Sequence, residues 1–80
     1  MTREEAYKTL NGVFQDVFDD DTLTVQDGTS AKDVDGWDSY EHINLIVAVQ
    51  NAFGVKFSMG ETTKLKNVGE MVDLILKKAN

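Results

Sequence analysis

The chain has 80 residues, a net charge of −6 and no cysteine or proline. Its length suits one domain covering residues 1–80, and its 41% hydrophobic and 28% charged residues are typical of a folded globular protein. The lack of cysteine excludes disulfides, thiolate metal sites and cysteine nucleophiles, and a single histidine, His42, excludes a histidine-rich zinc site. We therefore expect no metal site.

The charge is distributed unevenly along the chain. Residues 1–41 hold eleven acidic and three basic residues, whereas residues 42–80 hold three acidic and five basic ones. The acidic half would repel nucleic acid and anionic membranes, so we expect a partner with a basic surface, unless the acidity serves only solubility. The longest apolar run, Leu45 to Val49, is far shorter than the roughly 20 residues of a membrane span, and no signal peptide follows Met1. We expect a cytoplasmic protein.

The first predicted helix covers residues 3–18. Thr2 and Glu5 have the spacing of a capping box, in which each side chain bonds to the backbone of the other residue. Apolar side chains then recur every three or four positions, at Ala6, Tyr7, Leu10, Val13, Phe14, Val17 and Phe18. Three acidic residues at 19–21 are unfavourable at the negative end of a helix dipole, so the helix should end before them.

A long loop is predicted for residues 19–37. This segment has no helical periodicity and contains Gly28 and Gly36. Connections of this length in compact domains are more often functional than accidental. We expect its apolar residues to anchor it in the core: Leu23, Val25, Val34 and Trp37.

The second predicted helix runs from Ser39 to Phe53. Asp38 is a good N-cap, with Glu41 three residues later. The run 45–49 is apolar nearly all round, which indicates the most buried helix and is also compatible with a strand. The Asp38 cap and Gly54 as a helix-ending glycine favour the helix.

The remainder predicts a short extended segment and two further helices. Residues 55–57 alternate, and Ser58 with Glu61 is a second capping pair that opens one or two turns. Asn67 with Glu70 begins the last helix, whose apolar face holds Val68, Met71, Val72, Ile75 and Leu76. Three main helices and one short helix predict an all-α fold, a small four-helix bundle with a long loop after its first helix.

Ser39 and His42 are the residues that invite a chemical interpretation. Their spacing places them on one helix face, but serine hydrolysis also needs an orienting acid and an oxyanion hole, which so small a domain has little room to build. Ser39 also lies in the first turn of the buried helix, where free N–H groups and the helix dipole favour a phosphate. Local physics alone leaves open that Ser39 is an ordinary helix-start residue.

The stretch Gly36-Trp37-Asp38-Ser39-Tyr40 resembles the G-x-D-S-L motif of acyl and peptidyl carrier proteins. The likeness continues through Phe53-Gly54, the segment 55–57 and the stretch 64–68, and it covers nearly the whole chain. It implies a carrier rather than an enzyme. In the family, the serine at this position receives 4′-phosphopantetheine from coenzyme A, through a phosphopantetheinyl transferase that uses Mg²⁺.

By this resemblance Ser39 is the attachment residue, and the thiol of the arm carries acyl groups as thioesters between acyl-loading and acyl-transferring enzymes. We expect a monomer. Tyr40 replaces the usual leucine, and Glu41 is the only acidic residue from 40 to 53, so partner recognition should depend on Asp33, Asp35, Asp38, Tyr40 and Glu41. The candidate acyl groove consists of Ile43, Ile46, Val47, Leu65 and Val68, all of which are also compatible with plain core packing.

The residues around the motif favour a discrete acyl carrier of a specialised fatty-acid, polyketide or hybrid pathway. Two alternatives remain open. One is a peptidyl or aminoacyl carrier of a nonribosomal-type pathway. The other is an unmodified helical interaction module that binds partners through Tyr40, Ile43 and the acidic loop.

Overall fold

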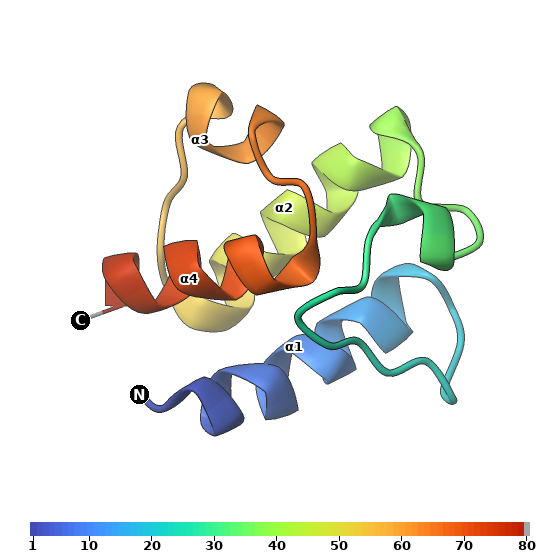
Figure 1. Cartoon of the computed structure of the whole chain (residues 1–80), viewed down its shortest axis with the longest axis horizontal. Coiled ribbons are helices and arrows are strands. Elements are labelled where there is room, and N and C mark those ends of the chain that lie inside the picture. The colour runs from blue at the N-terminus through green and yellow to red at the C-terminus, as the bar shows by residue number, and fades with distance from the viewer. Residues whose placement is uncertain (80) are drawn as a thin grey trace.

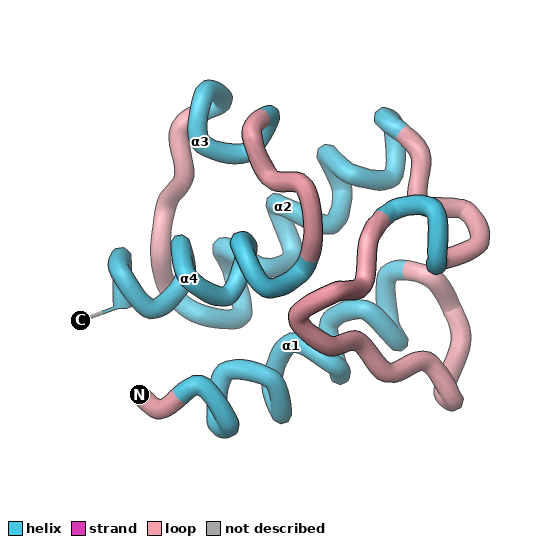
Figure 2. Tube along the Cα trace, in the orientation of Figure 1, coloured by secondary structure: helices cyan, strands magenta, loops and turns pink. Residues whose placement is uncertain are grey.

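The computed structural model describes residues 1–79, and the regular secondary structure within that range is all helical (Figures 1 and 2). It confirms the predicted all-α bundle of three main helices and one short one. The elements are α1 (Arg3–Val17), the 3₁₀ helix η1 (Ala31–Asp33), α2 (Ser39–Phe53), α3 (Met59–Thr63) and α4 (Val68–Ala79).

The ends of the helices follow from local hydrogen bonds. At the start of α1, the Thr2 hydroxyl accepts from the Glu5 N–H at 3.1 Å and the Glu5 carboxylate accepts from the Thr2 N–H at 2.8 Å, which is the predicted capping box. The helix ends one residue before the predicted end, and Asp19 turns the chain with a φ of 51°. α2 has the predicted bounds and ends at Gly54.

The core lies between α1, α2 and α4. Its fully buried members come from the apolar faces of these three helices: Ala6, Leu10, Phe14, Leu45, Val49, Val68, Met71, Val72 and Ile75. α3 contributes no apolar side chain to this core, and Thr62 is its one buried residue. Figure 1 shows α3 set apart from the other helices. α3 is therefore attached at the edge of the bundle rather than built into it.

The long loop is held by the predicted anchors. Val25 and Val34 are 6% exposed, and Leu23 and Trp37 are partly buried against the core. η1 was not predicted, because this single turn has no apolar stripe; in it the Asp33 carboxylate accepts from the Ser30 N–H at 2.9 Å. Apolar periodicity carries no signal for a contact of this kind.

The loop also completes the start of α4. The Val68 N–H donates to the Thr29 carbonyl at 2.8 Å, and the Gly69 N–H donates to the Asp27 carbonyl at 3.0 Å. The first N–H groups of a helix have no partner within it, so these loop carbonyls satisfy two of them. The predicted Asn67 cap is present too, with its side-chain oxygen 2.9 Å from the Glu70 nitrogen.

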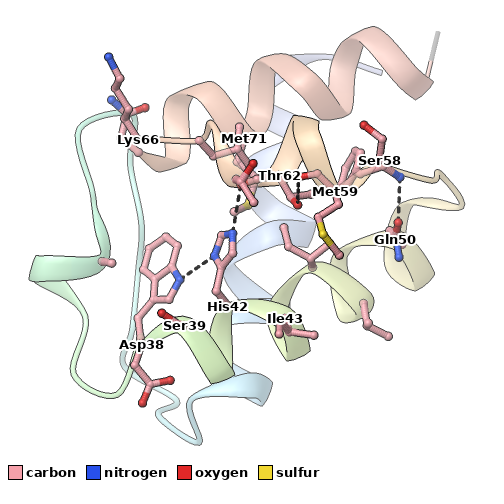
Figure 3. Close-up of a pocket in the computed structure, with 18 residues that line it drawn as sticks. Asp38, Ser39, His42, Ile43, Gln50, Ser58, Met59, Thr62, Lys66 and Met71 are labelled. Atoms are coloured by element: carbon pink, nitrogen blue, oxygen red, sulfur yellow. Dashed lines mark hydrogen bonds between the residues drawn. The ribbon is translucent and has the colours of Figure 1, made fainter.

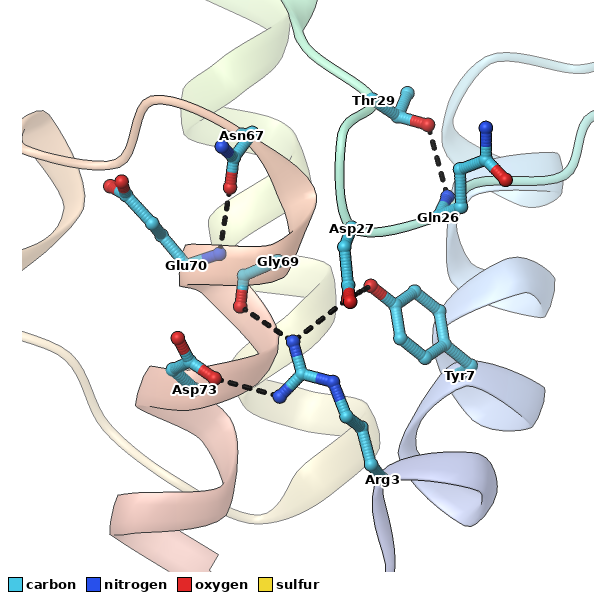
Figure 4. Close-up of polar contacts among 9 residues, drawn as sticks. All are labelled: Arg3, Tyr7, Gln26, Asp27, Thr29, Asn67, Gly69, Glu70 and Asp73. Atoms are coloured by element: carbon cyan, nitrogen blue, oxygen red, sulfur yellow. Dashed lines mark hydrogen bonds and ion pairs between the residues drawn. The ribbon is translucent and has the colours of Figure 1, made fainter.

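A polar cluster joins α1, the loop and α4 (Figure 4). The Arg3 guanidinium donates to Asp73 at 2.7 Å, to Asp27 at 2.8 Å and to the Gly69 carbonyl at 3.3 Å. The Tyr7 hydroxyl donates to the same Asp27 carboxylate. Residues far apart in the chain are thereby fixed to one another. No helix within residues 1–79 is long and apolar enough to cross a membrane.

Candidate functional site

Ser39 begins α2 and is exposed to solvent. The preceding Asp38 side chain accepts from the Glu41 N–H at 2.8 Å, as the sequence predicts for an N-cap. The Ser39 hydroxyl makes no hydrogen bond within residues 1–79, and the N–H groups of Ser39 and Tyr40 have no acceptor there. The site therefore presents a free hydroxyl beside free N–H groups at the positive end of a 15-residue helix.

The loop before Ser39 is fixed mainly by Trp37. Its indole meets the ring of Phe14 edge-on at 5.3 Å and lies 6.2 Å from the ring of Phe18. Gly36 has a φ of 87°, a conformation that glycine adopts without strain, and it turns the chain into the Trp37–Asp38 stretch. The start of α2 is thus positioned by an aromatic anchor two residues away.

His42 lies one helical turn beyond Ser39 and is half-buried (Figure 3). The Trp37 Nε1–H donates to His42 Nδ1 at 3.0 Å, and His42 Nε2 lies 3.3 Å from the Thr62 carbonyl oxygen. Because both ring nitrogens have other partners, His42 is not placed to act as a base on Ser39. This contact pattern argues against the serine-hydrolase alternative.

A cavity of about 750 Å³ opens between α2 and α3 and reaches Ser39 (Figure 3). Its size falls in the range of small-molecule sites. Four of the five residues expected in an apolar groove line it, namely Ile43, Ile46, Val47 and Leu65.

The expectation for Val68 is wrong. This side chain is fully buried in the core at the start of α4 and does not line the cavity. Met71, one helical turn further along α4, lines it instead. Plain core packing also describes Ile46, at 9% exposure, but does not describe Ile43 at 65% or Val47 at 49%.

The second wall of the cavity was not predicted from the sequence. Phe57, Met59 and Thr62 come from α3 and the segment before it. The Phe57 N–H donates to the Gln50 side-chain oxygen at 2.8 Å, which holds this segment against α2. The alternating pattern of residues 55–57 indicates an extended segment with one buried face. It does not indicate which helix that face packs against.

The five residues expected to recognise partners fall into two groups. Asp38, Tyr40 and Glu41 surround Ser39 in the first turn of α2, and Tyr40 is 73% exposed. Asp33 and Asp35 instead line a separate hollow, together with the side chains of Phe18, Asp19, Asp20, Leu23 and Val34. Asp35 is exposed and makes no hydrogen bond or ion pair within residues 1–79.

No group of histidine and acidic side chains in the described part of the chain is arranged to hold a metal ion. The chemistry offered by the site is therefore that of an exposed hydroxyl at a helix start, next to an apolar groove.

No family model matches the chain. A curated acyl carrier protein from Petrotoga mobilis is 32% identical over 82 residues, an alignment that covers 100% of this chain and 94% of the relative. The solution structure of a holo acyl carrier protein from Geobacter metallireducens matches with a TM-score of 0.85 and 46% identity, over 91% of this chain and 84% of that one. These similarities confirm the resemblance seen in the sequence: the chain belongs to the acyl carrier protein family, whose members are carriers and not enzymes.

Proposed function

We propose that this protein carries acyl groups on a 4′-phosphopantetheine arm attached to Ser39. The observation that carries the proposal is the position of the Ser39 hydroxyl, which is exposed, free of protein partners and located at the mouth of an apolar groove. A carrier needs these features together, because the arm must be added by one enzyme and its cargo must reach others.

The residues present fit such an arm. A phosphodiester on Ser39 places negative charge at the start of α2, where the helix dipole and the free N–H groups of Ser39 and Tyr40 favour it. When attached, the arm supplies a terminal thiol for thioester formation, a group that this cysteine-free chain lacks.

Attachment requires a phosphopantetheinyl transferase, coenzyme A and Mg²⁺. The Ser39 oxygen forms a bond to the phosphorus that bears the pantetheine, the pyrophosphate bond of coenzyme A breaks, and adenosine 3′,5′-bisphosphate leaves. The hydroxyl proton passes to a base of the transferase. The chain contributes an accessible nucleophile on a rigid helix start.

The groove supports a role in sheltering the cargo. Ile43 and Val47 expose apolar surface to water along one wall, and Leu65 contributes to the other. Covering apolar surface stabilises a complex by about 25 cal/mol per Å², so an alkyl chain would bind there in preference to water. We propose Ile43, Ile46, Val47 and Leu65 as the residues that contact the acyl chain.

We propose that partner enzymes recognise Tyr40 together with the four acidic residues Asp33, Asp35, Asp38 and Glu41. All five residues are exposed or half-buried, and the four carboxylates suit a transferase or acyl-transferring enzyme with a basic surface. We also propose that the protein is a monomeric, cytoplasmic carrier with a single domain.

Trp37 and His42 around the motif, together with the stretch 53–57, support a specialised fatty-acid, polyketide or hybrid pathway. Both relatives named above are acyl carriers, which favours an acyl cargo over an aminoacyl or peptidyl one. An unmodified interaction module remains the alternative of another class. It differs from the carrier in one respect that is simple to measure, the covalent state of Ser39.

The test is to incubate the unmodified protein with coenzyme A, Mg²⁺ and a promiscuous phosphopantetheinyl transferase, and then to measure its intact mass. We expect a gain of one phosphopantetheine that is lost in Ser39→Ala. Ser58→Ala is the matched control, since Ser58 also stands at the start of a helix and is exposed, and this variant should still be modified. No mass gain with several transferases would favour the interaction module.

A further inference from the structure

His42 connects three segments of the molecule through its two ring nitrogens (Figure 3). Nδ1 accepts from the indole of Trp37, in the loop before Ser39, and Nε2 faces the carbonyl of Thr62 in α3. The chain contains one histidine and one tryptophan, so this connection exists once. It links the loop that leads to the attachment serine with the helix that forms the second wall of the groove.

The two contacts require that one ring nitrogen is unprotonated and that the other carries a proton. An indole nitrogen only donates, so Nδ1 must accept, and a carbonyl oxygen only accepts, so Nε2 must donate. The neutral ring with its proton on Nε2 satisfies both Trp37 and Thr62. A protonated ring carries N–H at both positions, so its Nδ1–H would face the Trp37 N–H while its contact with Thr62 persists.

We propose that His42 is a positioning residue for the attachment site: the neutral ring holds the Trp37 loop to α2 and α3, and the protonated ring releases it. The proposal rests on the proposed function only in treating Ser39 as the attachment residue. Histidine is the side chain that most often acts as a charge switch in proteins, and a change of pH is therefore the way to test this release.

The charged groups around the ring are engaged with other atoms. Asp38 of the loop accepts from the Glu41 N–H, and the Glu41 carboxylate lies 3.4 Å from the side-chain nitrogen of Asn44. None of these groups hydrogen-bonds the His42 ring within residues 1–79.

The charged groups on the α3 side also make no hydrogen bond to the ring within residues 1–79. Glu61 of α3 pairs with Lys78 of α4 at 3.0 Å, and Lys66, in the connection to α4, shares the cavity with His42 without bonding to it. The partners of the ring are therefore the uncharged Trp37 and Thr62, and a change in its charge acts first on them.

Release of Trp37 matters because this residue lies two positions before Ser39. Without the His42 acceptor, its half-buried indole N–H has no partner, and the indole ring itself is then held by packing against Phe14 and Phe18. An unsatisfied polar group at such a position shifts the equilibrium toward open loop conformations, by about tenfold.

Nuclear magnetic resonance of the ¹⁵N-labelled, unmodified protein tests the proposal directly. At pH 8 we expect His42 to show an unprotonated Nδ1 and a protonated Nε2, and the Trp37 indole proton to be protected from exchange. On acidification to pH 5 the protection factor of the Trp37 indole proton should fall by about tenfold. This fall should coincide with the protonation of His42 observed in the same spectra. A protonated Nδ1 at pH 8, or constant indole protection through the titration, would overturn the proposal.

Two variants separate positioning from a merely structural role. His42→Asn keeps a non-titrating acceptor near the place of Nδ1, so indole protection should persist at both pH values. His42→Gln keeps a donor that reaches toward Thr62 but no acceptor near Nδ1, so the indole should be unprotected at both. Protection of the backbone amides in α1 and α4 from exchange verifies that each variant is folded. If indole protection in the His42→Asn variant falls on acidification as it does in the wild type, the proposal is contradicted.

A functional measurement uses the rate of Ser39 modification. The ratio of the wild-type rate to the His42→Asn rate cancels the pH dependence of the transferase itself. We expect this ratio to fall severalfold from pH 8 to pH 6, and a constant ratio would contradict a positioning role. The resonance experiment needs no arm, so the His42 switch and the carrier function fail independently of each other.

Discussion

Gly69 is a residue at which the backbone of the long loop lies directly against a helix. A Cβ atom placed there would lie 2.9 Å from the Asp27 carbonyl oxygen and 3.1 Å from the Asp27 Cα, both backbone atoms that are held in place by the Gly69 N–H and Arg3. We therefore expect Gly69→Ala to lower the free energy of unfolding by about 1–3 kcal/mol, as overpacking does in a core. Urea denaturation measures this change.

Gly12 provides the matched control. It also lies within a helix, but no atom is within 4 Å of the position that a Cβ would take there. Replacing a helical glycine with alanine stabilises by up to about 1 kcal/mol, so Gly12→Ala should raise the free energy of unfolding. The two Gly→Ala variants should thus have opposite signs, and a loss of similar size in both would refute the argument from close approach.

Tyr7 makes stability depend on pH in the alkaline range. Partial burial, followed by the hydrogen bond that the phenol donates to Asp27, raises its pKa from 10.0 to about 12. The folded protein thus favours the neutral phenol, so the stabilisation is complete below pH 10 and is lost as the pH rises toward 12. Tyr7→Phe should be less stable than the wild type at neutral pH and should lose less stability than the wild type between pH 10 and pH 12. Urea denaturation at a series of pH values measures both effects. Parallel pH profiles for the two proteins would contradict this assignment.

At the scale of the elements, α2 ends because of a single glycine. Gly54 has a φ of 67° and its N–H donates to the Gln50 carbonyl. No atom lies within 4 Å of the position that a Cβ would take, so the backbone conformation alone opposes a side chain. Gly54→Ala should lower the free energy of unfolding by about 1–2 kcal/mol, which thermal or urea denaturation measures.

Asparagine tolerates the left-handed conformation better than alanine, so Gly54→Asn should be the milder change. Equal losses in the two variants would show that the left-handed geometry is not what the glycine provides.

Helix caps made the elements predictable. The pairs Thr2–Glu5 and Ser58–Glu61 each form the expected capping box, and Asp38 caps α2 as expected. Each of these contacts joins residues three apart, so its pattern is visible in the sequence itself. η1 escaped prediction since it is a single tight turn without an apolar stripe.

At the scale of the whole molecule, the surface charge should govern encounter with the transferase. Asp35→Lys combined with Glu41→Lys should slow modification of Ser39 most at low ionic strength, because salt screens the attraction between exposed charges. The rate of mass gain at several salt concentrations measures this effect.

Glu4→Lys with Asp16→Lys produces the same change in net charge on exposed residues of α1 that are not among the five proposed recognition residues. This control should keep nearly the wild-type rate. If both double variants slow to the same degree, net charge rather than local charge steers the encounter.

The four helices, the bounds of α2 and the place of Ser39 in its first turn follow from local sequence patterns, because caps and apolar periodicity act between residues close in the chain. The tertiary structure alone decided that Met71 rather than Val68 lines the groove and that Trp37 and Thr62 occupy the nitrogens of His42. It also decided that Gly69 lies against Asp27. Most of these contacts join segments about 20 or more residues apart, so no local sequence pattern can indicate them. Val68 and Met71 lie on the same helix face, and local patterns do not distinguish them. Only the packing of the whole bundle decides which residues come into contact.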